Sequence, residues 1–104
     1  MEHSDLVLRH RLINGLVHDS EYLDEIFNDC NMTVDESRSQ RTFRLGEIII
    51  ELRALVRDGL FKRRPDTEWP DEAEIGRDVF SLTDQGRAYW ESHIKNADKS
   101  ELYR

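Results

Sequence analysis

The chain has 104 residues, a net charge of −7 and 38% hydrophobic residues, which together indicate one folded domain with a modest core rather than a disordered chain. Its single cysteine, Cys30, excludes an internal disulfide, and no apolar run approaches the roughly 20 residues that span a bilayer. The acidic N-terminal residues do not form a signal peptide, so we expect one cytoplasmic domain over residues 1–104, without membrane contact.

Two amphipathic helices are predicted within residues 4–30. The first covers residues 4–18, where leucines recur at four-residue spacing. The second begins after a cap at Asp19 or Ser20. Its apolar stripe consists of Tyr22, Leu23, Ile26, Phe27 and Cys30. Cys30 on this stripe is expected to be a small core residue rather than a nucleophile.

A long connection, residues 31–43, follows the second helix. It can hold a short extra helix capped by Thr33, order on a partner, or be a tolerated surface insertion. The sequence leaves these three alternatives open.

A third helix is predicted over residues 43–58. Its buried stripe is expected to comprise Leu45, Ile48, Ile49, Leu52, Leu55 and Val56. Gly59 is expected to end this helix, because glycine accepts the left-handed conformation of a helix C-terminus. The opposite side of the helix presents Glu47, Ile50, Ala54 and Arg57.

A β-hairpin is predicted over residues 60–82, with a basic first strand after Gly59 and a returning strand that ends at Leu82. Its tip is expected to be irregular, because it contains two prolines and proline cannot donate to a strand ladder. Thr83 is a good N-cap for a last helix over residues 83–97. After Asp98 the polar chain is expected to fray.

These segments resemble the winged helix-turn-helix superfamily over residues 43–90, somewhat under half of the chain. The residues that carry the resemblance are Leu52, Leu55, Gly59, Leu60, Lys62 and Arg63, then Leu82, Thr83 and Gly86. It implies an α+β, mostly helical winged-helix fold with a three-helix core, a two-stranded β wing and a C-terminal helix. It also implies that the third helix binds DNA. The connection over residues 31–43 departs from the family, because a helix-turn-helix joins its helices with about three or four residues.

The charge distribution supports a binding function with two alternative partners. Residues 38–64 carry eight basic and three acidic side chains, a balance of +5, whereas the rest of the chain carries −12. The first alternative is a small DNA-binding transcriptional regulator, because the positive segment suits a polyanion. Its candidate DNA contacts are Arg41, Arg44 and Arg57 in the groove and Arg38, Lys62, Arg63 and Arg64 on phosphates.

The second alternative is an acidic protein-binding module, such as an immunity protein or antitoxin that neutralises a basic toxin or nuclease. The wing tip is acidic around Trp69, and carboxylates there repel phosphates. Trp69 either anchors a partner or folds back onto the hairpin. Candidate partner contacts are Ile50, Trp69, Asp71, Glu72, Glu74 and Trp90, with Asp19, Glu21, Asp24 and Glu25 on the N-terminal helices.

Trp90 and Ile94 of the last helix either form a homodimer surface or pack on the first helix. Catalysis is not expected, because the four histidines are scattered and no metal, nucleophile or phosphate-loop motif is present. No cofactor or metal is expected either. The resemblance favours DNA binding and the overall charge favours a protein partner; we favour DNA by a small margin.

Overall fold

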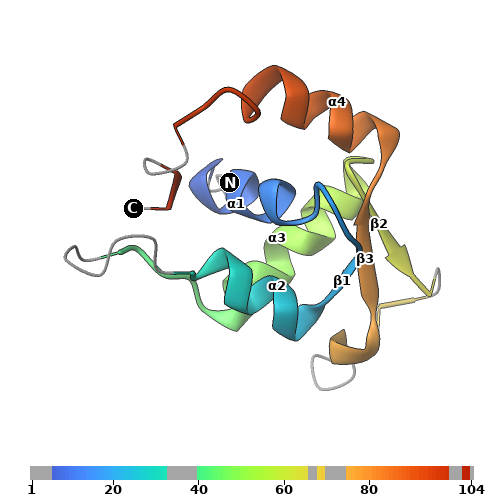
Figure 1. Cartoon of the computed structure of the whole chain (residues 1–104). Coiled ribbons are helices and arrows are strands. Elements are labelled where there is room, and N and C mark those ends of the chain that lie inside the picture. The colour runs from blue at the N-terminus through green and yellow to red at the C-terminus, as the bar shows by residue number, and fades with distance from the viewer. Residues whose placement is uncertain (1–5, 33–39, 66–67, 70–74, 99–101, 104) are drawn as a thin grey trace, which may run out of the picture.

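The computed structural model describes residues 6–32, 40–65, 68–69, 75–98 and 102–103. Within these ranges the chain forms an α+β fold with four α-helices and a small antiparallel sheet. In chain order the elements are α1 (Leu6–Gly15), β1 (Glu21–Tyr22), α2 (Leu23–Cys30), α3 (Leu45–Arg57), β2 (Phe61–Arg64), the 3-10 turn η1 (Ile75–Arg77), β3 (Val79–Leu82) and α4 (Asp84–His93). In Figure 1 the sheet stands at one side of the molecule, with α1, α2 and α3 packed together beside it and α4 above α1.

The sheet has three strands in the order β1-β3-β2, rather than the two strands expected from the sequence. β3 lies in the centre and pairs antiparallel with both neighbours, Glu21 facing Phe80 and Arg63 also facing Phe80 on the other side. The strand β1 has only two residues, which is too short to show the alternation that identifies a strand in a sequence. Tyr22 was therefore assigned to the apolar stripe of the second helix. The second helix therefore begins at Leu23, and the Glu25 carboxylate accepts the Tyr22 N–H at 3.1 Å in place of a cap at Asp19 or Ser20.

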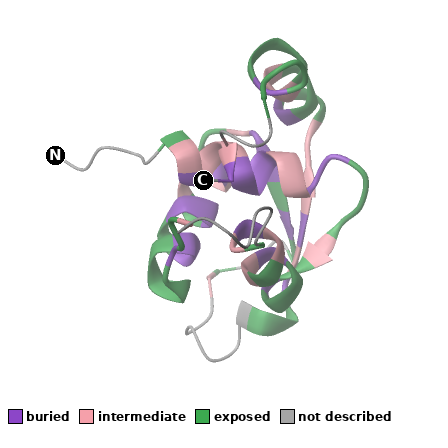
Figure 2. Cartoon of the chain, turned by 60° about the vertical axis from the view of Figure 1, so that its left-hand side comes forward, coloured by how far each residue is buried: buried purple, intermediate pink, exposed green. Residues whose placement is uncertain are grey.

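The core lies where α1, α2 and α3 face one another and the sheet. Figure 2 shows the buried residues gathered on these inner faces and the exposed ones on the outer surfaces. The predicted stripes supply most of the core: Leu8, Leu12, Leu16, Leu23, Ile26, Cys30, Ile48, Ile49, Leu52 and Leu55 are all buried. Leu45 and Tyr22 are exceptions, with 43% and 49% of their surfaces exposed, and Phe27 and Val56 are only partly buried. Leu45 occupies the first position of α3.

Two glycines, Gly59 and Gly86, allow α3, β2 and α4 to pack close together. Gly59 has a φ of +80° and donates to the Val56 carbonyl, while Leu60 N–H donates to the Leu55 carbonyl, which is the Schellman end of a helix. Gly59 thus ends α3 as predicted. At Gly86 a Cβ would lie 2.1 Å from the Leu60 carbonyl oxygen, so only glycine fits there.

The last helix is shorter than predicted, covering Asp84–His93 rather than residues 83–97. Thr83 caps it as expected, because its hydroxyl accepts the Gly86 N–H at 3.0 Å. Ile94 follows the helix and is buried, 1% exposed. Within the described residues, no helix is both long and apolar enough to cross a membrane.

The chain was expected to fray after Asp98, but the two residues that the structure describes beyond it, Leu102 and Tyr103, are packed. Leu102 is half-buried and Tyr103 is only 6% exposed. The Arg11 guanidinium explains this, because its Nε donates to the Leu102 carbonyl at 2.8 Å and it lies 5.3 Å from the centre of the Tyr103 ring. Asn14 also donates to the Tyr103 hydroxyl, at 3.3 Å. Leu102 and Tyr103 are therefore part of the packed structure.

Candidate nucleic-acid interface

The outward face of α3 was predicted to present Glu47, Ile50, Ala54 and Arg57. Glu51, Leu52 and Leu55 face the core, and the opposite arc is open to solvent. This arc, which we call the α3 face, comprises Gly46, Glu47, Ile50, Arg53 and Arg57, all exposed, with Ala54 half-exposed. Arg53 was missing from the predicted contacts, although its position three residues after Ile50 places it on the same side of a helix.

Two predicted arginines lie at the N-terminal end of α3. Arg44 is the residue before the first helical turn, and its N–H donates to the Glu47 carboxylate at 2.9 Å. Arg41 is exposed, and its guanidinium lies 4.7 Å from the centre of the Phe43 ring. The α3 face together with Arg41 and Arg44 therefore carries four arginines, and Glu47 is its one carboxylate within the described residues.

The segment before α3 is held rigidly by the buried side chain of Arg11, which is 1% exposed. Its Nη1 donates to the Arg41 carbonyl at 2.7 Å and to the Cys30 carbonyl at 3.0 Å. Asn31 adds two bonds, because its side chain accepts the Phe43 N–H at 2.8 Å and donates to the Phe43 carbonyl at 3.0 Å. These contacts fix the backbone that carries Arg41 and Arg44.

Trp69 folds back onto the hairpin, which decides between its two alternatives. Its ring stacks on Phe80, with 5.9 Å between ring centroids. The guanidinium groups of Arg63 and Arg53 lie 4.3 Å and 5.1 Å from the centre of the same ring. Trp69 thereby joins the outward face of α3 to the sheet, and its ring is only partly buried.

Arg63 is not available to grip phosphates, contrary to the prediction. Its side chain is 4% exposed, and its Nε donates to the Asp78 carboxylate, itself 5% exposed, at 2.9 Å. A further bond runs to the Glu68 carbonyl at 3.0 Å. The cause is strand alternation, because Phe61 and Arg63 point to the core face of β2.

Lys62 and Arg64 are exposed on the other face of β2. They therefore point away from the core face of the sheet, against which Trp69 packs. They form a second pair of exposed basic residues, on β2.

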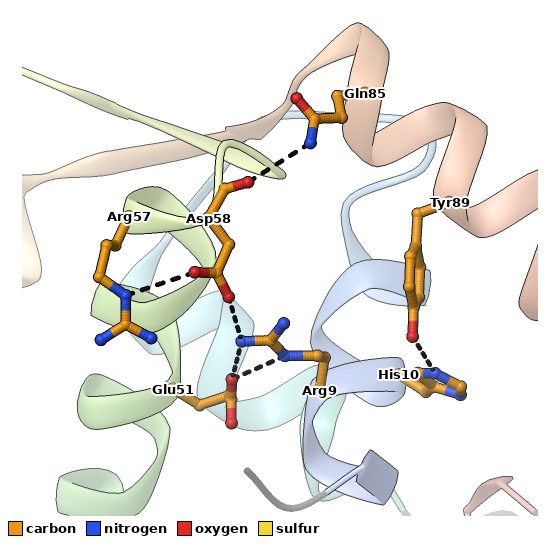
Figure 3. Close-up of polar contacts among 7 residues, drawn as sticks. All are labelled: Arg9, His10, Glu51, Arg57, Asp58, Gln85 and Tyr89. Atoms are coloured by element: carbon orange, nitrogen blue, oxygen red, sulfur yellow. Dashed lines mark hydrogen bonds and ion pairs between the residues drawn. The ribbon is translucent and has the colours of Figure 1, made fainter.

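Carboxylates beside α3 are neutralised by an ion-pair cluster (Figure 3). Arg9 of α1 lies between Glu51 and Asp58, at 2.8 Å and 3.1 Å. Asp58 also accepts from Arg57 at 3.3 Å. Slight burial raises the pKa of Asp58, but the hydrogen bonds from Arg9 and Arg57 hold it below its ordinary value. Arg57 keeps a side-chain exposure of 75%, and an ion pair this exposed exchanges readily for another anion.

The two predicted dimer residues of α4 are used inside the chain. Trp90 is half-buried, and its Nε1 donates to the Asn14 side chain of α1 at 3.1 Å. Ile94 belongs to the core. Beside them, the Tyr89 hydroxyl bonds to His10 of α1 at 2.9 Å (Figure 3). Of the two alternatives from the sequence, the structure shows packing on the first helix.

Four predicted contacts cannot be placed, because they lie outside the described residues: Arg38, Asp71, Glu72 and Glu74. The acidic candidates before and within α2 are described. Asp19, Asp24 and Glu25 are exposed, whereas Glu21 is half-buried.

Glu21 differs from its acidic neighbours, because its Oε2 is buried without a hydrogen-bond partner among the described residues. Burial raises the pKa of Glu21 to about 8, and hydrogen bonding to Asp29 and the charges of Asp29, Glu25 and Asp19 add to the rise. Glu21 is therefore protonated near neutral pH. In burial and charge it differs from the exposed carboxylates Asp19, Asp24 and Glu25 with which it was grouped.

Cys30 is a core residue, as its stripe predicted. Burial raises the pKa of its thiol to about 11, although Arg11 opposes the rise. A protonated, buried thiol is a poor nucleophile. Within the described residues, His, Cys, Asp and Glu side chains do not form groups of three that would hold a metal.

Comparison of the chain with models of protein families, with curated proteins and with solved structures finds no match to any of them.

Proposed function

We propose that this chain is a winged-helix DNA-binding module, with α3 as its recognition helix and the β2–β3 hairpin as its wing. The element order helix, short strand, helix, helix, hairpin, helix supports this proposal, as does the strand order β1-β3-β2. An α-helix fits the major groove of B-DNA, and its side chains then reach base edges and phosphates.

The observation that carries the proposal is the charge of the α3 face and the segment before it. Arg41, Arg44, Arg53 and Arg57 are all exposed, on a chain whose net charge is −7. From Arg44 to Arg57 the helix rises about 20 Å, at roughly 1.5 Å per residue. Four exposed arginines spread over this length, on a chain of net negative charge, orient the chain towards a polyanion.

The proposal is tested with a fluorescently labelled, mixed-sequence duplex at about 50 mM salt, where phosphate contacts are strongest. We expect affinity that falls with added salt, with a log–log slope of about −0.9 for each phosphate contacted. Arg44→Gln and Arg57→Gln should each weaken binding, and loss of a phosphate contact reduces the slope by about 1. Lys95→Gln, after the end of α4, is the matched control and should change neither quantity. Absence of binding in the low-salt buffer contradicts the proposal.

A second candidate function is capture of a basic protein, in the manner of an immunity protein or antitoxin. The exposed carboxylates Asp19, Asp24 and Glu25 favour it, because they gather beside β1 and at the start of α2. A basic protein that binds the chain should lose affinity in the variant Asp24→Asn/Glu25→Gln and keep it in Arg57→Gln. The DNA proposal predicts the opposite ranking for a duplex.

A further inference from the structure

Ile50 is an exposed apolar side chain in the middle of a basic helix face. With 59% of its surface exposed, it is the most exposed large hydrophobic residue among those described. It cannot be explained by packing within the chain, because the buried arc of α3 lies on the other side of the helix.

The neighbours of Ile50 on the α3 face make it project. Gly46, one turn before it, has no side chain, and a Cβ placed there would meet nothing within 4 Å. Ala54, one turn after it, carries only a methyl group. Arg53 lies three residues after Ile50 and Arg57 seven residues after it, while the acidic Glu47 lies three residues before it. Ile50 is therefore an apolar projection on a face with two arginines and one carboxylate, and the positions one turn before and after it carry little or no side chain.

A surface that complements this arrangement has an apolar spot set among negative charges. The major groove of DNA supplies such a spot wherever a thymine occurs, because the thymine C5-methyl group lies on the groove floor between the phosphate strands. Thymine is the one of the four bases that carries a methyl group at its major-groove edge. The charge of Arg53 and Arg57 favours DNA as the occupant, and the apolar side chain favours the thymine methyl group.

We propose that Ile50 is a specificity-determining residue that contacts the C5-methyl group of a thymine when α3 lies in the major groove. This inference rests on the proposed DNA-binding function and deepens it. Removing one methyl group from such a contact loses the burial of about one carbon, which corresponds to roughly a fourfold change in affinity.

The test begins with selection from a randomised duplex pool at about 50 mM salt, a concentration that keeps phosphate contacts strong. Sequencing of the bound fraction should show thymine at one fixed position. The selected duplex is then synthesised with thymine or with deoxyuridine there, which differ only by the methyl group. The wild-type chain should bind the thymine duplex about fourfold more tightly.

Ile50→Ala should bind both duplexes with equal affinity, and it should remain folded, because the side chain is exposed and alanine favours helix. Leu6→Ala is the matched control, since Leu6 is 58% exposed on α1, and it should keep the preference for thymine. Duplex binding without a thymine preference, or a preference that survives in Ile50→Ala, overturns this inference and leaves the proposed function standing. Failure to bind any duplex refutes the proposed function itself.

A protein contact at Ile50 gives a different result. If sedimentation shows that the wild-type chain self-associates and Ile50→Ala does not, the side chain belongs to an interface between copies, and the thymine contact is refuted.

Discussion

At Gly86 a single added methyl group is expected to destabilise the fold strongly. In Gly86→Ala the new Cβ would lie 2.1 Å from the Leu60 carbonyl oxygen and 2.7 Å from Cδ1 of Leu82. The Leu60 carbonyl cannot move away freely, because it accepts from the Thr83 N–H at 3.1 Å and from the Thr83 hydroxyl at 3.0 Å. The substitution therefore forces apart the start of β2 and the start of α4.

The expected loss of stability is the sum of three effects. Overpacking costs about 1–3 kcal/mol, and each hydrogen bond to Leu60 that breaks costs about 1 kcal/mol. The better helix propensity of alanine offsets about 1 kcal/mol of this loss. If both hydrogen bonds break, the free energy of unfolding should thus fall by about 2–4 kcal/mol, which lowers the melting temperature by roughly 8–32 °C in a domain of this size.

The assay is urea and thermal unfolding followed by circular dichroism, with Gly46→Ala as the matched control. Gly46 is also a glycine in the first turn of a helix, but a Cβ there meets nothing within 4 Å. Its replacement should raise the free energy of unfolding by about 0.5 kcal/mol, through helix propensity and reduced freedom of the unfolded chain. If Gly86→Ala matches Gly46→Ala in stability, α4 does not approach β2 as closely as described here.

Three further predictions concern buried polar groups and the chain end. Asp78→Asn leaves the buried Arg63 charge without its carboxylate, so urea unfolding should show that the free energy of unfolding falls by about 3–5 kcal/mol. A decrease under about 1 kcal/mol would mean that the ion pair is hydrated. Because Glu21 keeps its proton up to a pKa of about 8 in the folded chain, against 4.5 ordinarily, stability should decrease as pH rises between these values. Glu21→Gln should flatten this dependence, and an unchanged pH profile would refute the assignment. Tyr103→Ala removes buried surface, so thermal unfolding should show that the free energy of unfolding falls by about 2 kcal/mol. A neutral effect would show that Tyr103 is not docked on Arg11.

The helices were largely predictable because their apolar residues repeat at helical spacing. Ile48, Ile49, Leu52 and Leu55 are buried as their spacing indicates, and Gly59 ends the helix that they form. The strand β1 was not predictable, because two residues carry no period and their pairing with β3 depends on contacts distant in sequence. Strand pairing of this kind is decided by tertiary packing rather than by local preference.

The basic residues of the candidate site were only partly predictable. The run from Lys62 to Arg64 reads as uniformly basic, yet strand alternation turns Arg63 inward while its neighbours stay outside. Alternation was visible in the sequence, since Arg63 is two residues after Phe61. Its partner Asp78 was not, because the register of β2 and β3 brings together residues fifteen positions apart.

The most direct test of the DNA-binding proposal is a titration of the isotope-labelled chain with duplex DNA, followed by the NMR shifts of backbone amides. The proposal predicts that the largest changes fall between Arg41 and Arg57, on the segment before α3 and along the α3 face. The amides of α2 should change little. Largest changes on α2, or no changes at an excess of duplex at about 50 mM salt, would contradict the proposal that α3 is a DNA-recognition helix.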